Sequence, residues 1–194
     1  MKQLLEEIMK GINELFMSEA HFRSYLSRCL QQSLPQAIVN EEYPYPYKNK
    51  TIKVDIRVEN GGKEHYIELK YKTKKQATEN MHSYHIYKDI NRLETISKEN
   101  GSQNFFIFLT NNERYQKVHK DTDYEQFCLS EQICKGIHKW IKTELCERSE
   151  EELQKSYPAI EINNDYKIEW KNFGQSQEQL KNFHYFIIAI DNKA

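Results

Sequence analysis

The sequence predicts an α/β protein in which a central mixed β-sheet is flanked by helices. Segments with the two-residue period of strands alternate along the chain with segments that have the 3.6-residue period of helices. Residues 104–110, NFFIFLT, form a continuous apolar run of strand length, which is typical of a strand buried on both faces. Asn60-Gly61-Gly62 separates two alternating segments and indicates a tight hairpin.

The first quarter of the chain is expected to contain two helices, a strand and a loop. Residues 2–16 have apolar side chains on one helical face, and Ser18 suits the N-cap of a second helix that runs to about Ser33. Residues 37–43 form a short strand candidate. The following segment YPYPYKNK, residues 43–50, is expected to be a rigid extended loop, because proline and the residue before it avoid the helical region.

The remaining elements follow from the same periods. Residues 79–99 have apolar side chains at helical spacing and predict a long helix, which Gly101 ends. Residues 130–146 are also expected to be helical. Two further strand candidates lie near the C-terminus, at residues 166–173 and 184–191.

Length and composition limit the class of protein. A chain of 194 residues fits one domain with a substantial core. No apolar run is long enough to span a membrane, and acidic residues interrupt the first sixteen positions, where a signal peptide would be apolar; a cytoplasmic location is therefore expected. The net charge of −1 argues against a protein that coats DNA, but less against an enzyme that grips DNA in one cleft.

The four cysteines form no CxxC pair. Cys128, Cys134, His138 and Cys146 can be drawn as a zinc set, but their spacings match no common zinc module. We interpret the cysteines as free thiols in a reducing compartment.

The two segments around the glycine turn decide whether acidic side chains can meet. In residues 51–58, TIKVDIRV, the apolar side chains from Ile52 to Val58 face one way and Asp55 faces the other. Residues 64–72, EHYIELKYK, repeat this pattern with Glu68 on the polar face. A Gly61-Gly62 loop would set Asp55 directly opposite Glu68, whereas an Asn60-Gly61 loop would make them diagonal neighbours. Either register leaves both carboxylates on one face, with Cβ atoms about 5 Å or about 7 Å apart.

Asp55, Glu68 and Lys70 together have the chemistry of metal-assisted phosphodiester hydrolysis. Two carboxylates that face each other repel, and a bound cation removes that cost. Mg²⁺ or Mn²⁺ suits them, since such ions take oxygen ligands and Mg²⁺ keeps several waters. Lys70 lies on the same face as Glu68, where its ammonium can orient water or neutralise charge on a phosphate. We therefore predict Asp55 and Glu68 as metal ligands and all three residues as catalytic. Because the acids should repel, removing either one is expected to lower stability little.

These residues resemble the PD-(D/E)xK nuclease superfamily. A strand bearing Asp, a hairpin, and Glu-x-Lys on the next strand occur here as VDI (54–56) and IELK (67–70), with Val54 where the family name has proline. The order helix, three strands, helix, strand also resembles that family's restriction-endonuclease-like core, over roughly residues 15–112 of a single domain spanning 1–194. Residues 113–194 are expected to be helical and strand additions. The resemblance implies hydrolysis of nucleic acid, with DNA expected, in restriction, repair, recombination or defence.

The resemblance implies two further metal ligands. Relatives use the main-chain carbonyl between the Glu and the Lys, here Leu69, and some place another metal-binding Glu near the start of the first core helix, where Glu19 stands. Lys72, Lys74 and Lys75 follow the site and are predicted to contact nucleic-acid phosphates.

Residues 89–93, DINRL, also resemble the helix after the catalytic strand in several restriction-enzyme-like proteins. We interpret Asp89 and Arg92 mainly as a helical ion pair. Three histidines fit no ligand or triad pattern: His82, His85 and His119.

Two other classes of function compete with the nuclease. A non-catalytic member of the same fold could bind nucleic acid or a protein, an alternative that the near-neutral charge leaves open and the intact trio argues against; an unrelated α/β interaction domain could mimic the motif. A homodimer is compatible with the nuclease, because cutting both strands needs two sites.

Overall fold

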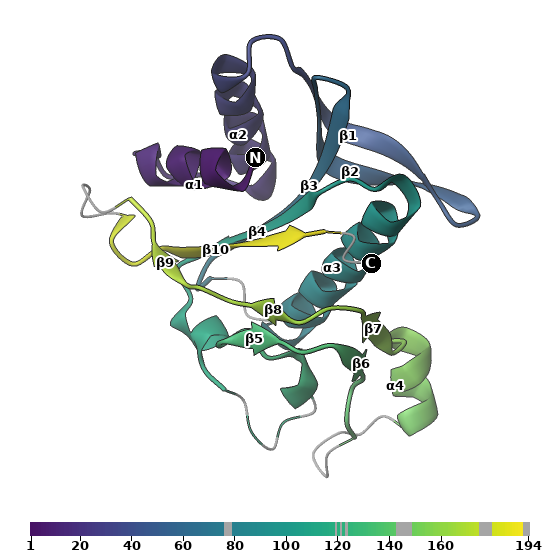
Figure 1. The fold of residues 1–194 in the computed structure, drawn as a ribbon. Coiled ribbons are helices and arrows are strands. Elements are labelled where there is room, and N and C mark those ends of the chain that lie inside the picture. Colours follow the sequence, from purple (N-terminus) through teal and green to yellow (C-terminus); the bar gives the residue numbers. More distant parts are fainter. Residues whose placement is uncertain are drawn as a thin grey trace.

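A computed structural model of the chain has a six-stranded mixed sheet at its centre (Figure 1). The structure describes residues 1–75, 79–118, 120, 122, 124–142, 149–174 and 180–191. The α/β class and the mixed sheet are confirmed. From one edge to the other the strands are β1 (Ile38–Tyr47), β2 (Lys50–Asn60), β3 (Lys63–Lys72), β4 (Asn104–Thr110), β10 (His184–Ile190) and β9 (Lys171–Asn172). Only β3 and β4 pair in parallel; the other neighbours are antiparallel.

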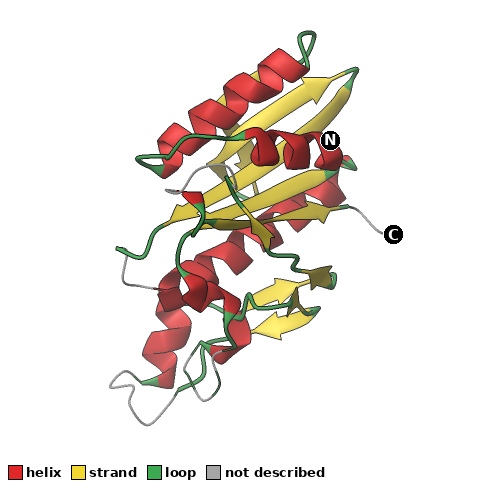
Figure 2. Cartoon of the chain, turned by 90° about the vertical axis from the view of Figure 1, so that its left-hand side faces the viewer, coloured by secondary structure: helices red, strands yellow, loops and turns green. Residues whose placement is uncertain are grey.

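Helices cover both faces of this sheet (Figures 1 and 2). α1 (Lys2–Gly11) and α2 (Glu19–Ser33) pack on one face, and α3 (Glu79–Asn100) packs on the other. Ser18 caps α2 as predicted, because its side chain accepts a hydrogen bond from the His21 N–H. The helix predicted over 2–16 is too long: it ends at Gly11, and the residues after it leave the helix to bury Ile12 and Phe16 in the core.

The β1–β2 hairpin departs from two predictions. Residues 43–47 continue β1 instead of forming a loop; Pro44 and Pro46 are tolerated there because β1 is an edge strand. The apolar side chains of β2 also do not share one face. Val54 packs in the α3-side core, whereas Ile56 and Val58 pack against α1 and α2. The change of face falls where β1–β2 pairing skips Glu42, whose φ is 47°.

The C-terminal third forms short strands that pack on α3. The helix predicted over 130–146 is wrong, since β5 (Gln132–Ile133) and β6 (Gly136–His138) occupy its described part, and residues 143–148 lie outside the described residues. Gly136 has a φ of 140°, which a helix does not accept. The strand predicted over 166–173 divides into β8 (Tyr166–Lys167) and β9, which belong to different sheets. The remaining elements are η1 (Glu113–Gln116), η2 (Glu125–Phe127), α4 (Glu150–Ser156) and β7 (Ile160–Ile162).

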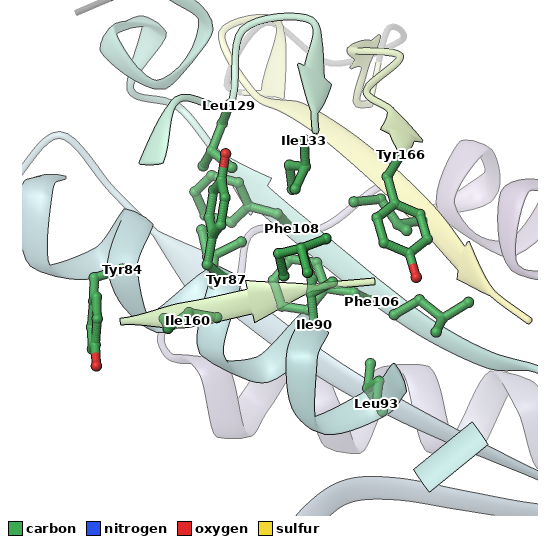
Figure 3. Close-up of a cluster of buried hydrophobic side chains, with 14 of the residues drawn as sticks. Tyr84, Tyr87, Ile90, Leu93, Phe106, Phe108, Leu129, Ile133, Ile160 and Tyr166 are labelled. Carbon is green, nitrogen blue, oxygen red and sulfur yellow. The ribbon is translucent and has the colours of Figure 1, made fainter. Parts of the chain in front are cut away.

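A single apolar cluster joins these additions to the sheet. Side chains of α3, of β4 and of the short strands interleave in it (Figure 3). The contributors labelled there are Tyr84, Tyr87, Ile90, Leu93, Phe106, Phe108, Leu129, Ile133, Ile160 and Tyr166. The cluster fixes α3 in one position above β3 and β4, and this position matters for the polar residues that α3 carries.

Glu94 ties α3 to the turn between β7 and β8. Its buried carboxylate accepts hydrogen bonds from the main-chain N–H groups and side-chain amides of Asn163 and Asn164, and from the Tyr166 hydroxyl. All of these donors are neutral, so hydrogen bonds alone compensate the burial of this charge. Within the described ranges, no helix is both long and apolar enough to cross a membrane.

Candidate active site

The pairing between β2 and β3 ends one step before the two predicted acids, Asp55 and Glu68. Gly61 and Gly62 form the two-residue loop, both with positive φ, and the register runs from Asn60↔Lys63 to Ile56↔Ile67. The predicted turn within residues 59–62 is confirmed. One step further, the same register sets Asp55 opposite Glu68, but the ladder has stopped there.

On its other edge β3 pairs with β4 from Ile67 to Lys72, which places Glu68 beside Phe106 and Lys70 beside Phe108. On the edge that faces β2, a side chain replaces the ladder at the opening where the pairing ends: Oδ2 of Asp55 accepts a hydrogen bond from the Leu69 N–H at 2.8 Å. Because the N–H and C=O of one residue point to the same edge of a strand, the Leu69 carbonyl also faces this opening.

Glu68 is buried on the α3 side of the opening. Its Oε1 lies 2.6 Å from Nη1 of Arg92, which also binds Asp89. Burial raises the pKa of Glu68 well above 4.5; the Asp89 and Asp55 carboxylates raise it further, while Arg92 and Lys70 lower it. A cation placed between Glu68 and Asp55 would therefore lower the free-energy cost of a charged Glu68 that is buried close to other carboxylates.

Lys70 is held between two acids from different helices. Its Nζ lies 3.0 Å from Oδ2 of Asp89 on α3 and 3.7 Å from Oε1 of Glu19 on α2. Burial disfavours the ammonium, but Asp89, Glu19 and Glu68 outweigh it, so the pKa of Lys70 is raised above its ordinary value. The side chain is thus a fixed cation at neutral pH.

Glu19 reaches the site from the first turn of α2, as the sequence predicted for its position. Its Oε2 accepts a hydrogen bond from the Tyr71 N–H at 2.9 Å and lies 3.7 Å from Nζ of Lys72. Among the described residues its partners Lys70, Tyr71 and Lys72 all belong to the lysine end of β3, so its contacts favour positioning Lys70 over holding the ion. The other two predicted phosphate contacts lie farther out: Lys74 pairs with Glu113, and Lys75 is exposed.

Arg23 is a site residue that the sequence reading missed. It projects from α2 and places Nη1 3.2 Å from Oδ1 of Asp55, with Glu41 and Glu42 of β1 also in contact. Its spacing of four residues from Glu19 puts both on one face of α2, which is the signal that could have found it. Arg92 and Asp89 do form the predicted helical pair, but they also bind Glu68 and Lys70.

The predicted acids of the site have basic partners without a metal. Glu19, Asp55, Glu68 and Asp89 lie against Arg23, Lys70, Lys72 and Arg92, and Arg23 also contacts Glu41 and Glu42. Across the described part of the chain, no three or more His, Cys, Asp or Glu side chains gather closely enough to hold a metal ion. A metal here would depend on two carboxylates, a main-chain carbonyl and water, a donor set that Mg²⁺ accepts.

The structure describes two of the three cysteines that can be drawn as a zinc set, Cys128 and Cys134. Cys29, Cys128 and Cys134 are free thiols. Both ring nitrogens of His138 face main-chain carbonyls, those of Gln126 and Cys134. Cys146 lies outside the described residues, as does His119.

Comparison with known proteins adds no relative: no family model, no curated protein and no solved structure matches this chain.

Proposed function

We propose that this protein is a Mg²⁺- or Mn²⁺-dependent nuclease of the PD-(D/E)xK type that hydrolyses phosphodiester bonds of nucleic acid, with DNA the expected substrate. The observation that carries the proposal is the end of the β2–β3 ladder, where Asp55, Glu68 and the Leu69 carbonyl face one opening and Lys70 follows on the same face. The order α2, β1, β2, β3, α3, β4 supports a restriction-endonuclease-like core within a single domain.

The residues present fit a divalent ion. Asp55, Glu68 and the Leu69 carbonyl supply hard oxygen ligands, and a cation would favour the charged form of Glu68, whose pKa is raised by burial and by the Asp89 and Asp55 carboxylates. The bound ion would lower the pKa of a coordinated water and polarise the phosphate. For the ion to bind, Arg92 would have to give up part of its contact with Glu68, or Arg23 part of its contact with Asp55.

Lys70 then acts on the phosphate and the attacking water. Its ammonium is held in place by Asp89 and Glu19 before substrate arrives, so it stabilises the charge that builds on phosphate oxygens without reorganisation. Asp89 and Glu19 are positioning residues in this scheme. They touch Lys70 and not the reacting atoms.

Cleavage and metal binding by three variants test the proposal. Glu68→Gln should weaken Mn²⁺ binding in calorimetry and abolish cleavage of plasmid and oligonucleotide DNA. Lys70→Met should still bind Mn²⁺ but lose about 10²–10³-fold in rate, because it removes a cation and no ligand. Lys167→Met is the control, since that lysine is exposed on β8 and, within the described part of the chain, forms its ion pair with Glu169. Wild-type activity in Glu68→Gln would refute the site.

A second function has one observation in its favour. Asp55, Glu68 and Asp89 each lie against a basic side chain without an ion, which suits a non-catalytic member of the fold that binds nucleic acid or a protein. Wild-type protein that binds DNA but cleaves neither DNA nor RNA with Mg²⁺ or Mn²⁺ would establish this alternative. The homodimer stays a prediction, which sedimentation of the wild-type protein measures.

A further inference from the structure

The polar side chains of α3 that face β3 meet the polar side chains of that strand in reverse chain order. Arg92 contacts Glu68, and Asp89, one turn earlier, contacts Lys70 two positions further along the strand. One helical turn rises about 5.4 Å and two strand residues about 6.7 Å, so the two series stay nearly in step. The next pair in this alignment is His85 with Lys72.

The charges around His85 agree with that position. Burial lowers the pKa of His85, Asp89 raises it, and the ammonium groups of Lys88, Lys70 and Lys72 lower it. The ring is half-buried, lies against the Tyr84 ring and makes no hydrogen bond to another residue that the structure describes. His85 is therefore a ring with an N–H donor beside several cations.

The charge pattern changes along the line of contact between α3 and β3. At the Glu68 end each acid has a basic partner. Towards the His85 end, Asp89 and Glu19 are already bound to Lys70, and Glu19 also lies against Lys72. An anion bound between His85 and Lys72 would therefore relieve repulsion among cations, where at the other end it would meet carboxylates.

We propose that His85 and Lys72 form a phosphate-binding subsite for the nucleic-acid backbone, one phosphate away from the phosphodiester that is cut. This inference rests on the proposed function for the position of the cut, and it restricts the substrate to a strand that continues past the scissile bond. The step of two β3 residues from Lys70 to Lys72 is comparable to the separation of consecutive phosphates in an extended strand. The Lys72 ammonium supplies charge and the His85 N–H supplies a directed hydrogen bond.

DNA binding under chelator tests the subsite without cleavage. Anisotropy of a labelled single-stranded oligonucleotide should show binding about tenfold weaker for His85→Gln and for Lys72→Gln, since each removes a donor to a charged phosphate. Lys72→Gln should also reduce the slope of log K against log salt by about 0.7. The double variant should lose less than the product of the single losses, because both residues serve one phosphate. Lys167→Gln is the control and should bind as the wild type does.

Neutral linkages identify which phosphate is bound. Methylphosphonate placed at one linkage at a time should cancel the penalty of His85→Gln at a single position, next to the cleavage position mapped with Mg²⁺. In wild-type protein the His85 ring resonances should shift when the oligonucleotide is added and shift little with inorganic phosphate at equal phosphate concentration. This measurement needs no substitution, so it also decides the matter should a variant fail to fold.

The outcomes separate the two proposals. Wild-type affinity in both single variants, or a penalty that no neutral linkage cancels, overturns the subsite while leaving the nuclease intact. Weakened binding in the variants of a wild-type protein that never cleaves upholds a phosphate site and refutes the nuclease. A wild-type protein that does not bind DNA refutes the subsite directly.

Discussion

Asp55 has a structural contact and a proposed chemical role that two substitutions can separate. Its Oδ2 accepts the Leu69 N–H at 2.8 Å and its Oδ1 lies 3.2 Å from Arg23. Asp55→Ala removes both, but Arg23 keeps Glu41 and Glu42, so the main loss is the bond from Leu69, worth roughly 1.5–3 kcal/mol to a charged acceptor. Asp55→Asn keeps a side-chain oxygen in the same place and retains most of that bond.

Urea unfolding with chelator, together with a Mg²⁺-dependent cleavage assay, measures both roles. We expect Asp55→Ala to lower the free energy of unfolding by about 2 kcal/mol and Asp55→Asn by less than about 1 kcal/mol, while both lose at least about 10²-fold in cleavage rate. Glu59→Asn is the matched control on β2: its carboxylate pairs with Arg57, which also binds Glu64. Equal destabilisation by Ala and Asn would refute the role of the Leu69 bond, and full activity in Asp55→Asn would refute the metal ligand.

Three further predictions concern the scaffold. Glu94→Gln should lower the free energy of unfolding by roughly 2–4 kcal/mol in urea, because an amide replaces one of two accepting oxygens, whereas exposed Glu161→Gln on β7 should change it little. Gly174→Ala should lower the melting temperature sharply, since φ is +61° and a new Cβ would stand 2.4 Å from Leu180 Cβ. Burial lowers the pKa of His65, so its neutral form stabilises the fold above its ordinary pKa of about 6.5 and that stability is lost as the pH falls below it. Urea midpoints measured from pH 7 to pH 5 should therefore fall more in the wild type than in His65→Gln.

The structure changes the expected stability of the site variants. Repulsion between Asp55 and Glu68 suggested that removing either acid would lower stability little. Each acid instead has its own arginine, Arg23 for Asp55 and Arg92 for Glu68, and Asp55 also satisfies a main-chain donor. A truncated acid therefore leaves donors without an acceptor, which costs more than the repulsion that it relieves.

The sequence alone determined the features that depend on local period and turn chemistry. The glycine loop, the alternation of β3 and the cap of α2 at Ser18 were all predictable, and with them the placing of Asp55, Glu68 and Lys70 near one another. These features depend on residues that are close together in the sequence. A shift of register by one residue would move every side chain of a strand to the other face, so the alternation and the turn together specify the pairing.

Only the tertiary structure decided where the strands part and which helices complete the site. The end of the β2–β3 ladder at Ile56, the change of face at Val54 and the short strands of residues 132–138 depend on what packs against them. Arg23 and Arg92 lie 32 and 24 residues from their acids along the chain. Contacts of that range arise because the two apolar clusters fix α2 and α3 on opposite faces of the sheet. The rotation of a helix about its own axis above a strand depends on this packing, and the period of the sequence does not predict it.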